Sequence, residues 1–174
     1  MPCALRAATD TLTEAERAWV DAGVLHLDDD ALVVGRVVDV RAPAIRSLTR
    51  TPAPPPGDVA AMVGRGDGLT PWGDDVLCGW LAVHRAAGVA TDPVDAEVRA
   101  GFDRTTMLSA TLLDCALHGE VIPEFAAYVA ALGARDGSTA RTALSRVGHS
   151  SGRGLLAGAL LALHRLGHEG TTAA

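Results

Sequence analysis

A pair of carboxylates, Asp74 and Asp75, follows a glycine-rich loop at the start of an apolar segment. Glycines in such a loop allow positive φ angles and let the backbone approach a ligand closely. The free amide groups and the positive dipole end of a helix beginning here would favour an anion such as a phosphate or a carboxylate. The residues predicted to contact this anion as part of the substrate site are Gly66, Gly68, Thr70 and Gly73.

Asp74 and Asp75 are the first predicted catalytic residues, because a positioned carboxylate can act as a general base. They are also the predicted ligands of Mg²⁺, the one cofactor that the sequence suggests, which would bridge to a phosphate. Neighbouring helix residues point about 100° apart, so we expect one carboxylate to face the site and the other to cap the helix or pair with an arginine. The alternative interpretation is a glycine-rich turn with acidic N-terminal capping. The loop is not a Walker A sequence, because the Lys-Ser/Thr ending is absent.

Two hydroxyl groups, those of Thr105 and Ser109, lie four residues apart on the apolar face of a predicted helix over residues 93–117. Buried hydroxyl groups need hydrogen-bond partners. These two would either line a polar pocket and bind the substrate or bond back to carbonyl groups one turn earlier.

A third cluster, residues 148–154, combines small residues and hydroxyl groups before another predicted helix. Ser150, Ser151 and Gly152 are predicted to bind the substrate, although N-capping alone would explain one of the serines. His149 is the third predicted catalytic residue, because a histidine titrates near neutral pH and can act as a general acid or base. The alternative is a solvent-exposed loop histidine.

The elements that must position these residues indicate an α+β chain that is mostly helical. A short N-terminal segment is predicted to contain β-structure and to precede a compact helical bundle with two glycine-initiated central helices. The predicted division is an N-terminal helix and strand segment over residues 1–50, a Pro-rich linker over 51–57 and a helical domain over 58–174. The predicted elements are helices over 11–22, 58–63, 73–87, 93–117, 123–132, 138–147 and 151–166 and strands over 24–26 and 31–40.

A weak internal repeat relates residues 72–79 to residues 151–158. Each segment has a glycine at a helix start, a leucine four residues later and a second glycine two residues after that. Gly79 and Gly158 would let the two helices pack closely, because they lack side chains that hold the backbones apart. The alternative is a chance likeness between helices rich in Ala, Leu and Gly.

Composition limits the classes of function. The chain has 174 residues and a net charge of −6, with no cluster of Lys or Arg, which argues against nucleic acid and anionic membranes as partners. Aromatic residues make up only 3%, so the core must be built from Ala, Leu and Val. Three cysteines fit no zinc pattern, and no signal peptide is recognised, so we expect reduced thiols and a cytoplasmic location. The longest apolar run, residues 155–163, is shorter than the roughly 20 residues of a membrane span.

The combined motifs resemble a bacterial domain-of-unknown-function family that includes a subunit of the oxamate carbamoyltransferase of allantoin breakdown. The family pattern reads Gly-Leu-Thr-Pro-Ser-Gly-Asp-Asp, here residues 68–75, and later Gly-x-Ser/Thr-Ser-Gly-x-Asp-x-Leu, here residues 148–156. The resemblance covers roughly residues 58–167 and implicates the site residues named above. This sequence departs from the pattern at Trp72, where a small Ser is usual, and at Gly154, where an Asp is expected.

Two functions follow as expectations. The first is an enzyme, or an active-site subunit, that acts on a small anionic carbamoyl- or carboxyl-bearing metabolite and is by resemblance carbamoyltransferase-related. The alternative is a non-catalytic subunit or metabolite-binding module of a multi-subunit complex, which the loss of the acid at Gly154 favours. Either would have a partner subunit or form a homo-oligomer.

Overall fold

The computed structural model describes residues 15–22, 24–32, 40–45, 51–132 and 137–167. These fall into two compact units, one within residues 4–39 and one from residue 40 onward. None of the described helices combines the length and the apolar character that a membrane span requires.

The N-terminal unit is a three-stranded antiparallel sheet, and the helix predicted over residues 11–22 is wrong where the structure describes it. The strands, in the order β1-β2-β3, are β1 (Ala18–Asp21), β2 (Val24–Leu27) and β3 (Asp30–Leu32). Trp19 of β1 lies opposite His26 of β2, and their rings stack with centroids 5.2 Å apart. Such cross-strand pairs stabilise a sheet and here outweigh the helical pattern of the local sequence.

Of the two strands predicted over residues 24–26 and 31–40, the structure describes the first in full and the second only in part. The first is confirmed as β2, whereas β3 ends at Leu32 and residues 33–39 lie outside the described part of the chain. The carboxylate of Asp28 accepts hydrogen bonds from the amides of Glu16 and Arg17, at 3.1 and 2.9 Å. These bonds tie the turn between β2 and β3 to the chain that enters β1.

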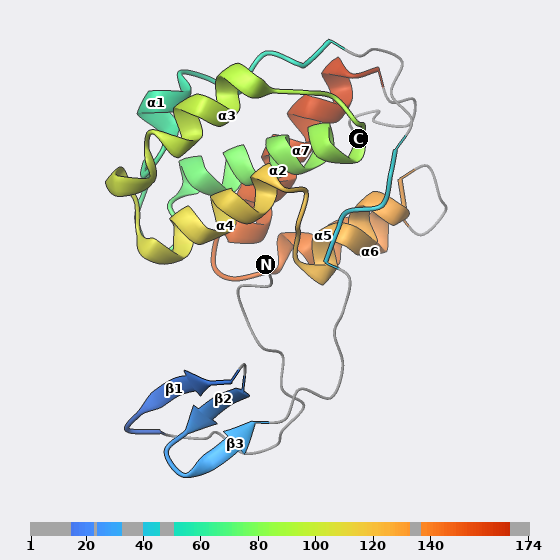
Figure 1. Ribbon diagram of the computed structural model, residues 1–174. Helices are drawn as coiled ribbons and strands as arrows, with labels where there is room; N and C mark the ends of the chain where they lie inside the picture. Colours follow the sequence, from blue (N-terminus) through green and yellow to red (C-terminus); the bar gives the residue numbers. More distant parts are fainter. Residues whose placement is uncertain (1–14, 23, 33–39, 46–50, 133–136, 168–174) are drawn as a thin grey trace. The chain divides into compact units, whose positions relative to one another are not determined.

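The second unit is helical, as predicted. It contains α1 (Val59–Met62), α2 (Trp72–Ala86), α3 (Asp92–Arg99), the 3₁₀ turn η1 (Phe102–Arg104), α4 (Met107–Leu117), α5 (Pro123–Ala130), α6 (Gly137–Ser145) and α7 (Ser151–Arg165). Figure 1 shows α2 between α4 and α7. Leu77, Trp80 and Leu81 of α2 are all fully buried, so the prediction of a central helix is confirmed.

Helices α2 and α7 pack through a reciprocal pair of glycines. A Cβ added to Gly79 would collide with the carbonyl oxygen of Leu155, and one added to Gly158 would collide with that of Val76. Val76 and Leu155 occupy equivalent positions in the internal repeat. The two helices therefore contact each other through equivalent residues, which supports structural pseudo-symmetry over chance likeness.

The single helix predicted over residues 93–117 is wrong, because the chain breaks between α3 and α4. A Cβ at Gly101 would lie 3.0 Å from Val63, so the chain crosses close to α1 at this point. Thr106 then begins α4 as its N-cap, with its hydroxyl accepting a bond from the amide of Ser109. Thr105 has extended backbone, so it does not share a helix face with Ser109.

The Pro-rich stretch over residues 51–57 lies against α2. The buried amide of Ala53 donates to Nε2 of His84 at 2.9 Å, and the indole N–H of Trp80 donates to the carbonyl of Pro54 at 3.2 Å. Nδ1 of His84 lies 2.8 Å from the carbonyl of Trp80, so the ring is neutral with its hydrogen on Nδ1. The division of domains predicted at this stretch stays a prediction.

Candidate functional site

The glycine-rich loop needs its glycines for two different reasons. Gly64, Gly66 and Gly68 have φ angles of 77°, 120° and 92°, a region that other residues rarely adopt. Gly73, in contrast, is required by packing, because an added Cβ would collide with the carbonyl oxygen of Met62. The predicted role of Gly73 in substrate binding therefore competes with a structural role that the geometry explains.

Asp74 holds three separate segments together. Its Oδ1 accepts a bond from the amide of Gly64 at 2.7 Å, and its Oδ2 accepts bonds from the hydroxyl groups of Thr105 and Ser109 at 2.5 and 2.6 Å. The side chain is fully buried. Asp74 thus fixes the loop and the start of α4 to α2. Because the hydroxyl groups of Thr105 and Ser109 donate their hydrogens to Asp74, they cannot donate them to a ligand at the same time.

Asp75 lies in a different environment, at the junction of α2 with α7. It is 4% exposed, and its Oδ2 is buried without a hydrogen-bond partner among the described residues. Burial raises the pKa of Asp75 from 3.8 to about 7; bonds from Ser151 and Thr70 oppose the rise and the Asp74 charge adds to it. A carboxyl group that titrates near neutral pH suits proton transfer.

The hydroxyl groups beside Asp75 come from both helix starts. Oγ1 of Thr70 and Oγ of Ser151 are 2.7 Å apart, although 81 residues separate them in the sequence. The structure therefore brings together three of the predicted site residues, Thr70, Asp75 and Ser151. Neither Asp74 nor Asp75 pairs with an arginine in the described structure, contrary to one of the sequence-based alternatives.

The backbone amides at the two helix starts are less available than expected. The N–H of Gly73 donates to the carbonyl of Arg65, and the N–H groups of the two following residues donate to that of Pro71. At α7, the N–H of Gly152 donates to Val147, and the two following amides donate to Ser150. The prediction that the first-turn amides are free to bind an anion is therefore wrong for these six N–H groups.

The donors around Asp74 do not fit Mg²⁺. Both of its carboxylate oxygens already accept hydrogen bonds from N–H or O–H groups, which a cation would have to displace. Within the described ranges, no three His, Cys, Asp or Glu side chains gather where they could hold a metal ion. The carboxylate of Asp74 is therefore not available as the predicted Mg²⁺ ligand.

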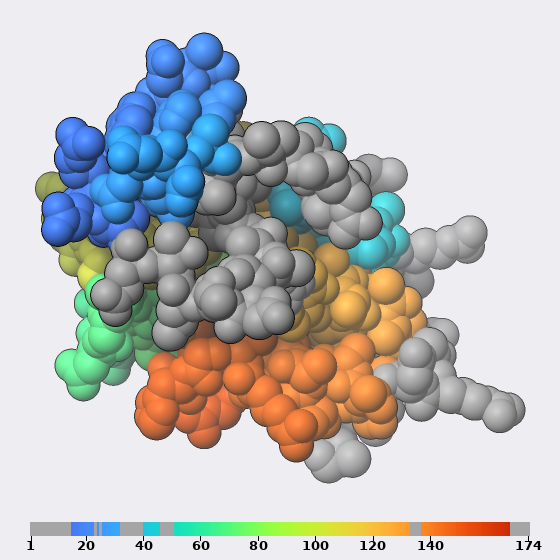
Figure 2. Space-filling model, turned by 90° about the horizontal axis from the view of Figure 1, so that it is seen from below, coloured from blue at the N-terminus to red at the C-terminus, as the bar shows by residue number. Residues whose placement is uncertain are grey.

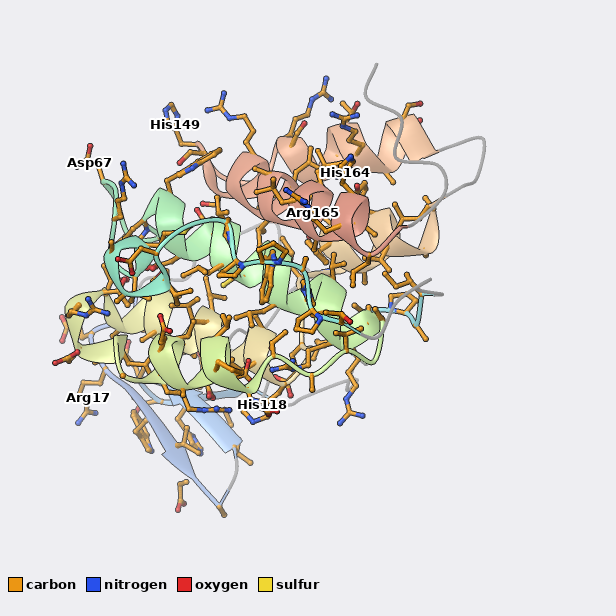
Figure 3. The ribbon with its side chains drawn as sticks, turned by 90° about the horizontal axis from the view of Figure 1, so that it is seen from above. Arg17, Asp67, His118, His149, His164 and Arg165 are labelled. Atoms are coloured by element: carbon orange, nitrogen blue, oxygen red, sulfur yellow. The ribbon has the colours of Figure 1, made fainter. Side chains whose placement is uncertain are left out.

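The remaining predicted residues lie around the start of α7. Ser150 is at the N-cap position but makes no side-chain capping bond. Gly152 packs against α6, because an added Cβ would collide with the carbonyl of Leu144. His149 is exposed, and Figure 3 shows its side chain pointing away from the helices. The structure does not bring His149 together with the buried carboxyl of Asp75.

The family of the chain follows from a comparison with known protein families. The family model for AllH, the oxamate carbamoyltransferase subunit AllH, matches residues 62–163. The chain belongs to the AllH family. The matched range contains both helix starts, both carboxylates and the hydroxyl groups that surround them. No curated protein and no solved structure matches the chain.

Two contacts at the candidate site were not predicted from the sequence. A Cβ on Gly154 would lie 2.6 Å from Cβ of Asp75 and 3.4 Å from the ring of Trp72. Gly154 thus permits the close approach of α7 to Asp75, and the two departures from the family pattern, Trp72 and Gly154, touch each other. The internal repeat could have indicated the first contact, since it aligns Gly154 with Asp75. No sequence pattern indicates the second contact, the hydrogen bond from the amide of Gly64 to Asp74.

Proposed function

We propose that this chain is an active-site subunit for transfer of a carbamoyl group, acting on a small anionic carbamoyl- or carboxyl-bearing metabolite. The observation that carries the proposal is Asp75, a buried carboxyl with one unpartnered oxygen and a pKa near neutrality. Stability alone disfavours such a group, because burying a carboxylate without partners is costly. Perturbed carboxyl groups of this kind gather at functional sites.

The chemistry requires a proton acceptor. When a carbamoyl group moves to a nitrogen acceptor, a C–N bond forms, the leaving group departs with its electron pair, and the nitrogen loses a proton. Oδ2 of Asp75 would accept that proton, since it has no other hydrogen bond in the described structure. The hydroxyl groups of Thr70 and Ser151, which bond to each other beside Asp75, would orient the carboxyl group.

The family name supplies the class of substrate. An oxamate carbamoyltransferase acts on oxamate, a small anion with both a carboxylate and an amide nitrogen. The positive ends of the α2 and α7 dipoles, which lie side by side at this site, would favour such an anion. We therefore propose oxamate and a carbamoyl donor such as carbamoyl phosphate as test substrates.

The test is Asp75→Asn in the complex of this chain with the other subunits of the enzyme. We expect turnover to fall by about 10²–10⁴-fold, the usual contribution of a general base, with circular dichroism unchanged. Asp67→Asn is the matched control, because Asp67 is an exposed carboxylate in the same loop, and it should keep wild-type activity.

A second function, a non-catalytic subunit, is favoured by Gly154, where the family pattern has an acid. In that case Asp75→Asn would leave turnover of the complex at the wild-type level. This result would also refute the proposal that Asp75 is the proton acceptor. Activity of the purified chain alone would exclude the non-catalytic role.

A further inference from the structure

Four large apolar side chains are exposed around the glycine-rich loop. Their exposed fractions are 71% for Leu69, 43% for Trp72, 87% for Met107 and 44% for Leu108. We call these four residues the apolar rim. Single exposed apolar side chains are ordinary, but several gathered in one place point to an interaction surface.

The rim residues come from three elements, the glycine-rich loop, α2 and α4. The hydroxyl of Thr106 donates to the carbonyl of Leu69 at 2.5 Å, which holds the loop beside the first residues of α4, Met107 and Leu108. On the other side, the Trp72 ring lies against Gly154 at the start of α7. Figure 2 shows the loop, in green, beside the orange chain that leads into α7.

The rim is also held firmly in place. Thr106 caps α4 through the amide of Ser109, and the hydroxyl of Ser109 binds the buried Asp74. Asp74 in turn binds the loop at Gly64. These bonds order the backbone that carries the rim, so less conformational entropy is lost when a partner docks.

The buried Asp75 lies next to Trp72, one member of the rim. Trp72 of the rim and the Asp75 side chain both contact the position of Gly154, and Oδ2 of Asp75 has no donor within the described part of the chain. The charges around the loop have both signs, since Arg65 and Asp67 are both exposed there. A partner for this surface therefore needs apolar side chains at its centre rather than one strong charge.

We propose that the apolar rim docks another subunit of the carbamoyltransferase, through a face with an apolar centre and a polar margin. This inference rests on the proposed function, because the family to which the chain belongs is a subunit family. Docking there would place the second subunit at the edge of the Asp75 site, so that the active site is completed between two different chains.

The experiment is co-expression of the full chain with the other oxamate carbamoyltransferase subunits of the same organism, followed by light scattering and titration of the purified components. Leu69→Asp and Met107→Asp should each weaken the complex at least 10-fold. Leu161→Asp is the control, because Leu161 is an apolar α7 residue outside the rim with 48% exposure, and it should bind like the wild type. Circular dichroism of each isolated variant checks that it folds.

Wild-type affinity in both rim variants would overturn the proposal. So would a homodimer of the wild-type chain that Met107→Asp dissociates, because the rim would then bind a second copy. The proposed function fails separately: an Asp75→Asn complex that assembles normally and keeps full turnover refutes the role of Asp75 but leaves the docking surface standing.

Discussion

Replacing Asp75 by asparagine should make the protein more stable at alkaline pH. Asparagine has nearly the shape of aspartate but carries no charge, so Asp75→Asn removes the desolvation cost that burial imposes on the ionised carboxylate. The opposite result is expected at Asp74, whose carboxylate accepts three hydrogen bonds. An amide there would bring an NH₂ group against existing donors.

The size and the pH range of the effect follow from the pKa of Asp75, which rises from 3.8 to about 7 on folding. Between these two values the unfolded chain has lost its proton while the folded protein keeps it, so wild-type stability falls as pH rises. Above the folded pKa the loss is complete. At ~1.4 kcal/mol per pH unit it reaches roughly 4 kcal/mol, an upper estimate.

Urea unfolding at pH 5, 6, 7 and 8 would measure this difference for the wild type, Asp75→Asn and the control Asp74→Asn. The gap between Asp75→Asn and the wild type should widen up to about pH 7 and then stay constant, because all other titrating groups are shared and cancel. Asp74→Asn should be less stable than the wild type at pH 6 to 8, by about 2 kcal/mol or more.

A constant gap across this pH range would refute the reasoning about Asp75. It would mean that the carboxyl titrates at the same pH in the folded and unfolded states, and the argument for an acid–base role would lose its physical basis. An Asp75→Asn variant less stable than the wild type at pH 8 would show that the carboxylate makes stabilising bonds instead.

Two further predictions concern the core. Gly79→Ala and Gly158→Ala should each destabilise the protein by about 2 kcal/mol or more in thermal unfolding, because the added methyl group forces α2 and α7 apart; the ~1 kcal/mol that alanine gains over glycine within a helix does not offset this. Leu161→Ala should change stability far less, and equal losses in all three variants would contradict the close-packing argument. Burial lowers the pKa of His84 below 6.5, so wild-type stability should fall as the pH drops below about 6.5, where the unfolded chain gains a proton that the folded ring resists. His84→Ala should be the less stable protein at pH 7 but should lack this acid-dependent loss, and a parallel pH profile in the two proteins would count against a buried neutral His84.

The sequence predicted best where one segment carries its own structural signal. Helix α2 shows apolar residues almost all round, and α7 has in its first turn Gly152, which the internal repeat aligns with Gly73. Prediction failed where distant contacts decide. Residues 18–21 have a helical local pattern but pair with β2, and the break before α4 lets Thr105 reach Asp74.

The residue types at residues 68–75 and 148–156, by themselves, determined the family and the positions of two glycine-initiated helices. They did not distinguish Asp74 from Asp75, which are chemically identical neighbours. The tertiary structure separates them, because helix geometry turns Asp74 toward Thr105 and Ser109 and turns Asp75 toward Thr70 and Ser151. Desolvation and hydrogen bonding set the pKa of a carboxyl group. For Asp75 the hydroxyl group of Ser151 comes from the start of the distant helix α7, whereas that of Thr70 comes from the nearby loop. Only folding therefore makes one aspartate a structural anchor and the other a candidate for chemistry.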